Sequence, residues 1–335
     1  MTRSRAPNIR TRRLGRTELK VSEFGLGCAR IGGIFKREPA EFVTLLSTAF
    51  DAGISFFDTA DIYSQGESET LIGRVFRGRR REQVVIASKA GYILPSRRRL
   101  IAGVKPLVRP LIRLLGLKRR HVAGAVSGSL GQDFSPSHLR RAVEGSLRRL
   151  RTDRLELFQL HSPPFEIVAE GGWIEVLEAL KAEGKIRYFG VSCDSVEAAQ
   201  AALGHSGVSS VQLAINLLDR KAVTVLPRAH EQGVGVIARE CLANGLLVKD
   251  VSAVDVRKYT RSDGEATAKA KQIELYRRTA AESGLTPTQL ALQFVSQLEG
   301  VSVSLVGVSS LDQLISLLSK EFPIPLARNT IPHFP

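Results

Sequence analysis

Eight short apolar runs alternate with amphipathic segments along most of the 335 residues. Such alternation builds βα units, in which helices cover a parallel sheet. The runs expected to form strands are 24–29, 55–60, 84–91, 154–161, 186–192, 210–216, 235–241 and 301–308. The segments expected to form helices include 41–52, 69–77, 136–151, 173–183, 196–203 and 266–283. Eight units in a chain of this length predict an α/β fold, a closed (β/α)8 TIM barrel, in a single domain spanning residues 1–335.

An open, doubly wound sheet is the alternative α/β architecture. It would hold a nucleotide on a glycine-rich first turn with three glycines at fixed spacing. The nearest match is Gly-Leu-Gly-Cys-Ala-Arg at 25–30, in which Arg30 occupies the position of the third glycine. We therefore prefer the closed barrel, whose reactive side chains lie at the carboxyl ends of the strands.

The net charge of +15, from 48 Lys and Arg against 33 Asp and Glu, is concentrated in two segments. Residues 1–20 carry +6 and residues 92–133 carry +8, which leaves +1 for the rest of the chain. We interpret residues 1–12 as a basic N-terminal tail and residues 92–133 as a long basic insertion after the third barrel strand. Tyr92 is the one aromatic residue of these segments, so they lack a stacking platform for bases, and nucleic acid is not an expected partner.

The insertion admits three interpretations. Lys105, Arg109 and Arg113 recur every four residues among apolar side chains, which would set a cationic stripe beside an apolar one. The first interpretation is a solvated basic loop with a docked helix. The second is a cover over the catalytic mouth that favours anionic or amphipathic substrates. The third is a peripheral contact with an anionic membrane. We favour the membrane contact least. Charges and two prolines within 100–117 argue against a membrane-spanning helix.

The sequence indicates neither metal nor disulfide chemistry. Cys28, Cys193 and Cys241 are far apart and outside any C-x-x-C spacing, and the six histidines show no H-x-H or H-E-x-x-H pattern. A G-x-S-x-G nucleophile elbow is absent as well. Arg12 and Arg13 are followed by polar residues instead of the apolar stretch of an export signal, so we expect a cytoplasmic protein.

Four reactive side chains belong to three neighbouring strand candidates. Asp58 lies in the run 55–60 and Tyr63 follows it, Lys89 lies near the end of 84–91, and His161 ends 154–161. Each has an ordinary structural explanation: an ion pair, a tyrosine packed at the rim, a histidine in the core. Because the carboxyl ends of barrel strands meet at one mouth, their coincidence favours a catalytic group.

Six motifs in barrel order resemble those of the aldo-keto reductase superfamily, over nearly the whole chain. They are Arg-Leu-Gly-Arg-Thr at 13–17, Phe-Asp-Thr-Ala-Asp-Ile-Tyr at 57–63, Leu-His-Ser-Pro at 160–163, Glu-Gly-Lys-Ile-Arg at 183–187, Gly-Val-Ser at 190–192 and Gly-Val-Ser at 307–309. The resemblance implies a barrel that binds an extended nicotinamide dinucleotide without a Rossmann motif. The cofactor is usually NADPH, with NADH as the second choice, and the reaction is carbonyl reduction.

The resemblance assigns one role to each of the four residues. Tyr63 donates the proton to the carbonyl oxygen as hydride arrives, and His161 orients that oxygen. Lys89 is the ammonium expected to lower the pKa of Tyr63 from its ordinary value near 10, and Asp58 keeps Lys89 charged.

The resemblance also implies contacts with the cofactor. The matching positions are Ser192 and Gln212 for the nicotinamide carboxamide, Leu242 and Gly245 for the pyrophosphate loop, Arg261 for a phosphate clamp, and Gly307, Ser309 and Gln313 for the adenosine phosphate.

Four positions depart from the family pattern. Cys193 replaces an Asn or Arg, and Ile215 stands close to where many relatives have an aromatic residue. Ser310 replaces a common basic residue and Leu317 a common Asn. A missing cation predicts a weaker preference for NADPH over NADH.

The expected function is that of an NAD(P)H-dependent aldo-keto reductase or alcohol dehydrogenase, acting on an aldehyde, a ketone or a keto-sugar, or on the alcohol in reverse. The partner is therefore a small-molecule carbonyl or alcohol. The alternative is a nucleotide-binding regulatory subunit of the same fold with little turnover, as in the potassium-channel β-subunits. The sequence favours no particular oligomeric state.

Overall fold

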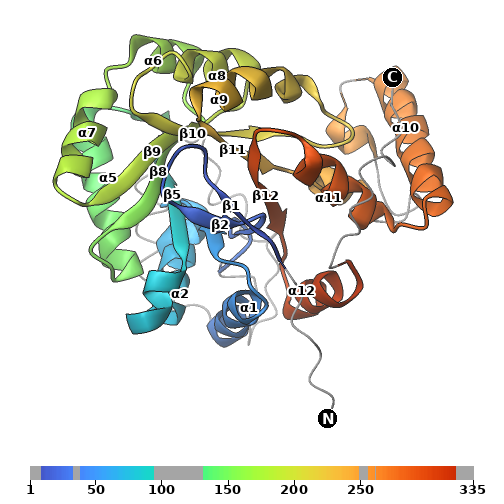
Figure 1. Ribbon diagram of the computed structural model, residues 1–335, viewed down its shortest axis with the longest axis horizontal. Helices are drawn as coiled ribbons and strands as arrows, with labels where there is room; N and C mark the ends of the chain where they lie inside the picture. The colour runs from blue at the N-terminus through green and yellow to red at the C-terminus, as the bar shows by residue number, and fades with distance from the viewer. Residues whose placement is uncertain (1–8, 33–37, 94–130, 249–255, 261, 322–335) are drawn as a thin grey trace, which may run out of the picture.

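The computed structural model describes residues 9–32, 38–93, 131–248, 256–260 and 262–321, and Figure 1 shows their arrangement. Eight strands in this part of the chain form a closed barrel in the order β10-β11-β12-β3-β4-β5-β8-β9, with every neighbouring pair parallel. The strands are β3 (Phe24–Gly27), β4 (Phe56–Asp58), β5 (Val85–Ala90), β8 (Leu155–His161), β9 (Ile186–Ser192), β10 (Val208–Ala214), β11 (Gly235–Arg239) and β12 (Val301–Gly307). The predicted TIM barrel is confirmed, and each strand lies within two residues of its predicted run.

Helices between the strands form the outer ring of the barrel (Figure 1). The six predicted helices are α1 (Pro39–Asp51), α2 (Glu67–Val75), α5 (Pro136–Leu150), α7 (Ile174–Ala182), α8 (Val196–Ala202) and α10 (Asp263–Glu282). Four more are α6 (Phe165–Glu170), α9 (Leu226–Gln232), α11 (Pro287–Gln297) and α12 (Leu311–Ser316). Three of these are too short to show a helical period. The fourth, α11, is buried over most of its length and so has no polar face to reveal it.

The alternation of side chains along each strand separates two apolar cores. Phe56, Ala87, Leu157 and Ile237 point into the barrel, where they form one cluster. Their neighbours in sequence point outward and pack under the helices in a second, larger cluster, as Phe57 does. Because both faces of a parallel sheet are covered in this way, the strands appear in the sequence as nearly continuous apolar runs.

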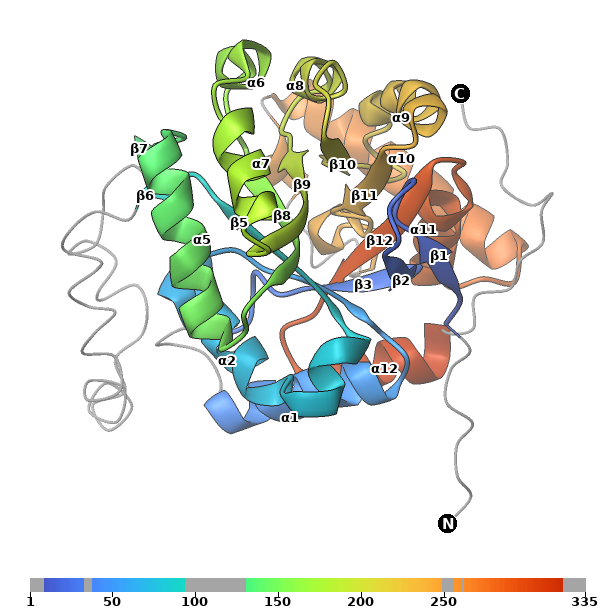
Figure 2. The same cartoon turned by 60° about the vertical axis from the view of Figure 1, so that its left-hand side comes forward.

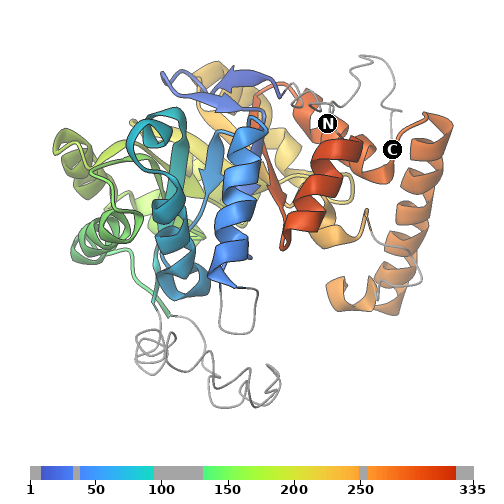
Figure 3. The same ribbon diagram turned by 90° about the horizontal axis from the view of Figure 1, so that it is seen from below.

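An antiparallel hairpin of β1 (Thr11–Arg13) and β2 (Lys20–Ser22) closes the amino end of the barrel. Its apolar residues Leu14, Leu19 and Val21 join the inner cluster. Figure 3 shows the hairpin, in dark blue, lying over one end of the barrel. Gly15 turns the chain with a φ of +54°, and a side chain there would collide with the backbone of Gly233.

The basic N-terminal tail expected over residues 1–12 ends before residue 12. Thr11 and Arg12 belong to β1, and the guanidinium groups of Arg10 and Arg12 both donate to the buried carboxylate of Glu23. Positive charge in this part of the chain is therefore bound into the fold, because it neutralises an acidic side chain that the barrel buries.

The predicted insertion leaves the opposite end of the barrel. Its first and last residues form a two-stranded ribbon, β6 (Tyr92–Ile93) with β7 (Gly131–Gln132), in which Tyr92 pairs with Gln132. Figure 2 shows this ribbon on the side of the barrel away from the hairpin. Residues 94–130, with the proposed cationic stripe, lie outside the described residues. Within the described part of the chain, no helix is long and apolar enough to cross a membrane.

Candidate active site

Inward-facing positions change from apolar to polar over two residues at the carboxyl end of the barrel. Phe56 is followed two residues later by Asp58, and Ala87 in the same way by Lys89. The same parity brings His161 of β8, Ser192 of β9 and Gln212 of β10 to this end. Five adjacent strands therefore meet in a polar mouth, where a TIM barrel carries its active site.

A buried ion pair lies in the mouth. The ammonium Nζ of Lys89 donates to Oδ2 of Asp58 at 2.7 Å and to the carbonyl oxygen of Thr59 at 2.9 Å. The Lys89 side chain is 1% exposed. The ammonium is thus held by a charge and a carbonyl inside a water-poor site, where breaking the pair would leave an uncompensated charge.

Tyr63 lies on the turn that follows β4. Lys89 Nζ is 5.1 Å from the centre of the Tyr63 ring, and the ring meets that of His161 edge-on with 5.6 Å between centroids. The turn is held by the backbone N–H of Asp61, which donates to the carbonyl of Lys89 at 3.0 Å. The structure thus brings together the four residues singled out from the sequence.

Burial and charge act on the Tyr63 hydroxyl in opposite directions. Burial raises its pKa, the charges of Lys89 and Arg239 lower it, and the net result is a pKa above the ordinary value of 10.0. Lys89 thus lowers the pKa of Tyr63, as expected, but desolvation of the phenolate is the larger effect and decides the net direction. Tyr63 keeps its proton at neutral pH.

Lys89 and His161 have different charge states at neutral pH. Burial lowers the pKa of Lys89, but Asp58 and Tyr63 outweigh it and the net pKa is raised, so Lys89 is an ammonium. Burial, Lys89 and Arg239 lower the pKa of His161 to about 3, so its imidazole is neutral. The Nδ1 atom of His161 is buried without a hydrogen-bond partner among the described residues. A neutral imidazole in this position is able to hydrogen-bond an incoming oxygen.

Two of the proposed cofactor contacts are connected to the ion pair. Ser192 Oγ donates to Oε1 of Gln212 at 3.0 Å, and Gln212 Nε2 donates to Oδ1 of Asp58 at 2.9 Å. Ser192, Gln212, Asp58 and Lys89 therefore form one hydrogen-bonded chain across the mouth. Each amide and carboxylate is fixed in orientation by the next group, because a buried polar atom must find a partner.

The loop after β11 holds Leu242 and Gly245, the two residues proposed for the pyrophosphate. Leu242 precedes a short turn, Ala243–Gly245, in which three successive residues have positive φ, +90° at Gly245. Within this turn the backbone N–H groups of Ala243 and Gly245 donate to the carbonyls of Glu240 and Leu242, at 2.7 and 2.9 Å. Arg261, the proposed phosphate clamp, lies outside the described residues.

Ser310 has a structural role in the segment after β12. Ser310, taken as the site of a missing cation, is nearly buried, and its hydroxyl caps α12 by accepting from the N–H of Gln313 at 3.1 Å. Ser309 is less buried, and its N–H and hydroxyl both donate to the Gln313 side chain at 2.9 Å. Ser309 is thus the position from which a longer side chain would reach solvent. Gly307, which ends β12, is exposed.

Arg239 is a residue of the mouth that the sequence analysis missed. It ends β11 two residues after the inward-facing Ile237, and so points toward the mouth. Its Nη2 donates to Asp194 at 2.6 Å and to the carbonyl of Cys193 at 3.2 Å, and Nη1 donates to Glu240. The alternation of inward and outward side chains along β11 could have revealed Arg239 from the sequence. Ile215, the position compared with an aromatic in relatives, is instead buried in the outer core.

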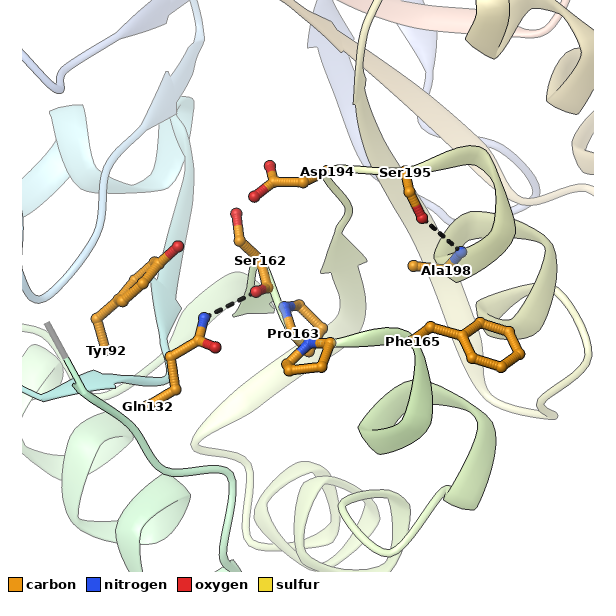
Figure 4. Close-up of a pocket in the computed structure, with 9 residues that line it drawn as sticks. Tyr92, Gln132, Ser162, Pro163, Phe165, Asp194, Ser195 and Ala198 are labelled. Carbon is orange, nitrogen blue, oxygen red and sulfur yellow. Dashed lines mark hydrogen bonds between the residues drawn. The ribbon is translucent and has the colours of Figure 1, made fainter. Parts of the chain in front are cut away.

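A pocket of about 390 Å³ is lined by Ser162, the residue that follows His161. Tyr92 forms one wall, and its ring meets that of His161 edge-on at 4.9 Å. In Figure 4 the Tyr92 hydroxyl, the Ser162 side chain and the Asp194 carboxylate lie around the hollow, while Gln132 donates to the Ser162 carbonyl. The remaining lining comes from Pro163, Pro164, Phe165, Ser195 and Ala198. The pocket combines apolar surface with a few convergent polar groups, as small-molecule sites do.

Comparison with known proteins agrees with this geometry. The model of the aldo/keto reductase family matches residues 23–326. The chain belongs to the aldo/keto reductase family. Two relatives from Bacillus subtilis are the oxidoreductases YqkF, 28% identical over 91% of this chain and 89% of that protein, and YrpG, 30% identical over 90% and 87%. This aldo/keto reductase is thus an oxidoreductase by family.

A solved structure extends the agreement to the fold. The aldo-keto reductase AKR11C1 from Bacillus halodurans, in its holo form, superposes with a TM-score of 0.75 at 26% identity, covering 96% of this chain and 94% of that one. Members of the family use NAD(P)H. In the described part of this aldo/keto reductase, no cluster of three or more His, Cys, Asp or Glu side chains is arranged to hold a metal ion.

Proposed function

We propose that this aldo/keto reductase reduces the carbonyl group of an aldehyde, ketone or keto-sugar, with NADPH as the hydride donor and Tyr63 as the proton donor. The observation that carries the proposal is the buried cluster of Asp58, Lys89, Tyr63 and His161 at the mouth of the barrel. A bound nicotinamide dinucleotide supplies the hydride.

The residues around the mouth fit such a cofactor. Ser192 and Gln212 are each 2% exposed and lie at the ends of adjacent strands, where their polar atoms suit a carboxamide. Leu242, Gly245, Gly307, Ser309 and Gln313 would line the rest of the dinucleotide.

Proton transfer follows from the protonation states. Tyr63 holds its proton because burial raises its pKa, and Lys89 beside it stabilises the phenolate as the proton leaves. The ammonium is held in place by Asp58. His161 is neutral and donates or accepts a hydrogen bond without adding charge, so that it orients the carbonyl oxygen toward Tyr63.

The substrate would enter through the pocket beside His161. Tyr92, Pro163 and Phe165 provide apolar surface for its carbon skeleton, and Ser162 and Asp194 provide acceptors for hydroxyl groups. A small carbonyl compound is therefore the proposed partner.

A steady-state assay of NADPH oxidation over a panel of aldehydes, ketones and keto-sugars tests the proposal. Tyr63→Phe should bind NADPH like the wild type but turn over roughly 10² to 10⁴ times more slowly, the usual effect of a general acid. Tyr188→Phe is the matched control, because the Tyr188 hydroxyl lies away from the mouth, where it accepts from the backbone N–H of Glu18 at 3.3 Å. Equal turnover in Tyr63→Phe and wild type contradicts the assignment, and NADPH binding without turnover on any carbonyl favours a regulatory subunit.

A further inference from the structure

Arg239 places a second positive charge at the mouth, in addition to Lys89. In the β10–β11 register Gln212 lies opposite Ile237, and Ala214 lies opposite Arg239. Ile237 points into the barrel, so the side chain of Arg239, two residues further, points the same way and emerges just beyond Gln212. It therefore neighbours the side chain proposed to hold the nicotinamide carboxamide.

The Arg239 guanidinium is held rigidly. Its side chain is 23% exposed and bonds to Asp194, to Glu240 and to the carbonyl of Cys193. These partners lie on the loops after β9 and β11, so the arginine joins the wall of the substrate pocket to the proposed pyrophosphate loop. Its Nε is buried and has no hydrogen-bond partner within the part of the chain that the structure describes.

The charge of Arg239 acts inside the mouth. It lowers the pKa of both Tyr63 and His161, the two groups that would flank the substrate carbonyl. The carboxylates that pair with it lie on the solvent side, with side chains 62% exposed at Asp194 and 36% at Glu240. Water screens these carboxylates more than it screens the guanidinium, so a net positive potential remains on the inner side.

We infer that Arg239 makes this aldo/keto reductase bind the reduced form of its nicotinamide cofactor more tightly than the oxidised form. The inference rests on the proposed function and deepens it. Hydride transfer to a carbonyl held by Tyr63 and His161 requires the nicotinamide ring to lie next to that carbonyl. The ring is then within reach of the Arg239 charge. That ring is neutral when reduced and carries a positive charge when oxidised, so a fixed cation at the mouth repels only the oxidised form.

The consequence is a preferred direction of turnover. A site that binds the reduced cofactor more tightly is occupied by the form that reduces a carbonyl. After the reaction it releases the oxidised cofactor readily. Arg239 therefore determines which redox state of the cofactor binds more tightly, and it is neither the proton donor nor the proton acceptor.

The dissociation constants of NADPH and NADP⁺, measured without substrate by fluorescence or calorimetry, test the inference. In Arg239→Met the ratio Kd(NADP⁺)/Kd(NADPH) should fall about threefold to tenfold. The substitution removes the guanidinium charge, whose repulsion of the oxidised ring is partly screened by water. Arg239→Lys keeps the charge and should keep the ratio. Arg140→Met is the matched control, because Arg140 pairs with Glu183 on the outer surface and should leave both constants unchanged.

Asp194→Asn provides a test of opposite sign. Removing this exposed carboxylate strengthens the net positive potential, so the ratio should rise, and the result stands even if Arg239→Met does not fold. If both dissociation constants in Arg239→Met rise by the same factor, or if the ratio is unchanged in Asp194→Asn, Arg239 is only a structural clamp and the inference is overturned. A wild type that binds neither nucleotide overturns the proposed function, and the inference with it.

Discussion

The two ends of the barrel are built from the same strands, but their inward-facing side chains have opposite character. At the amino end Phe56 and Ile237 pack with Leu14 of the hairpin in an apolar cluster. Two residues further along the same strands, Asp58 and Arg239 stand in the polar mouth. The first end is stabilised by removing apolar surface from water. The second is stabilised only because each charge is matched by another, so substitutions at the two ends should have different consequences.

The largest combined effect is expected at the polar end, from Lys89→Met. Asp58 would be left as a buried charge without its cation, which costs about 3–5 kcal/mol of unfolding free energy, and turnover would be lost with the ammonium. Urea unfolding and a turnover assay measure the two effects. Adding Asp58→Asn to Lys89→Met should recover much of the stability but none of the turnover. Recovery of both would show that the ion pair has only a structural role.

Phe56→Ala tests the apolar end. The substitution leaves a cavity in the inner cluster and should lower the unfolding free energy by about 3–5 kcal/mol. Turnover per folded molecule should stay at the wild-type value, because Phe56 contributes nothing to the polar mouth. Chemical denaturation together with an assay below the unfolding transition checks both parts. A folded variant with strongly reduced turnover would mean that the two ends are not independent.

Acid should weaken the fold through His161. Its pKa is about 3 in the folded protein and about 6.5 when unfolded, so the unfolded chain binds the extra proton between these values. The associated stability is fully present above pH 6.5 and is lost as pH falls toward 3, by at most about 1.4 kcal/mol per pH unit. Urea unfolding at several pH values should show a shallower dependence in His161→Gln. His230→Gln, on an exposed histidine, is the control, and equal slopes in all three proteins would refute the effect.

The smallest effect is expected at the rim, from Ser309→Arg. A new cation there should strengthen binding of NADPH relative to NADH by about 1 kcal/mol, roughly fivefold, as a solvent-exposed contact with the 2′-phosphate. Ser310→Arg is the informative comparison, since it also removes the hydroxyl that caps α12 and should lower stability. Dissociation constants for both nucleotides measure the preference. An unchanged preference in Ser309→Arg would place the 2′-phosphate elsewhere.

The sequence predicted the catalytic side of the mouth better than the cofactor side. Asp58 and Tyr63 lie in one short motif, and Lys89 and His161 lie at the ends of strands whose apolar runs are easy to identify. Their positions follow from chain order once a parallel barrel is assumed. On the other side the predicted run 235–241 continues past Arg239, which ends the strand, so the local pattern does not mark Arg239 as a strand-end residue.

The sequence by itself determined the number, type and order of the barrel elements, because alternation of apolar and polar residues is a local property that survives in a single chain. Only the tertiary structure decided which polar groups are buried and what they bond to. The pKa of Tyr63 rises because the effect of burial is larger than that of the Lys89 charge. The Ser310 hydroxyl caps the helix α12, and Arg239 joins two loops that are 45 residues apart in the chain. Desolvation and long-range pairing depend on neighbours that packing brings together, and no local pattern records them.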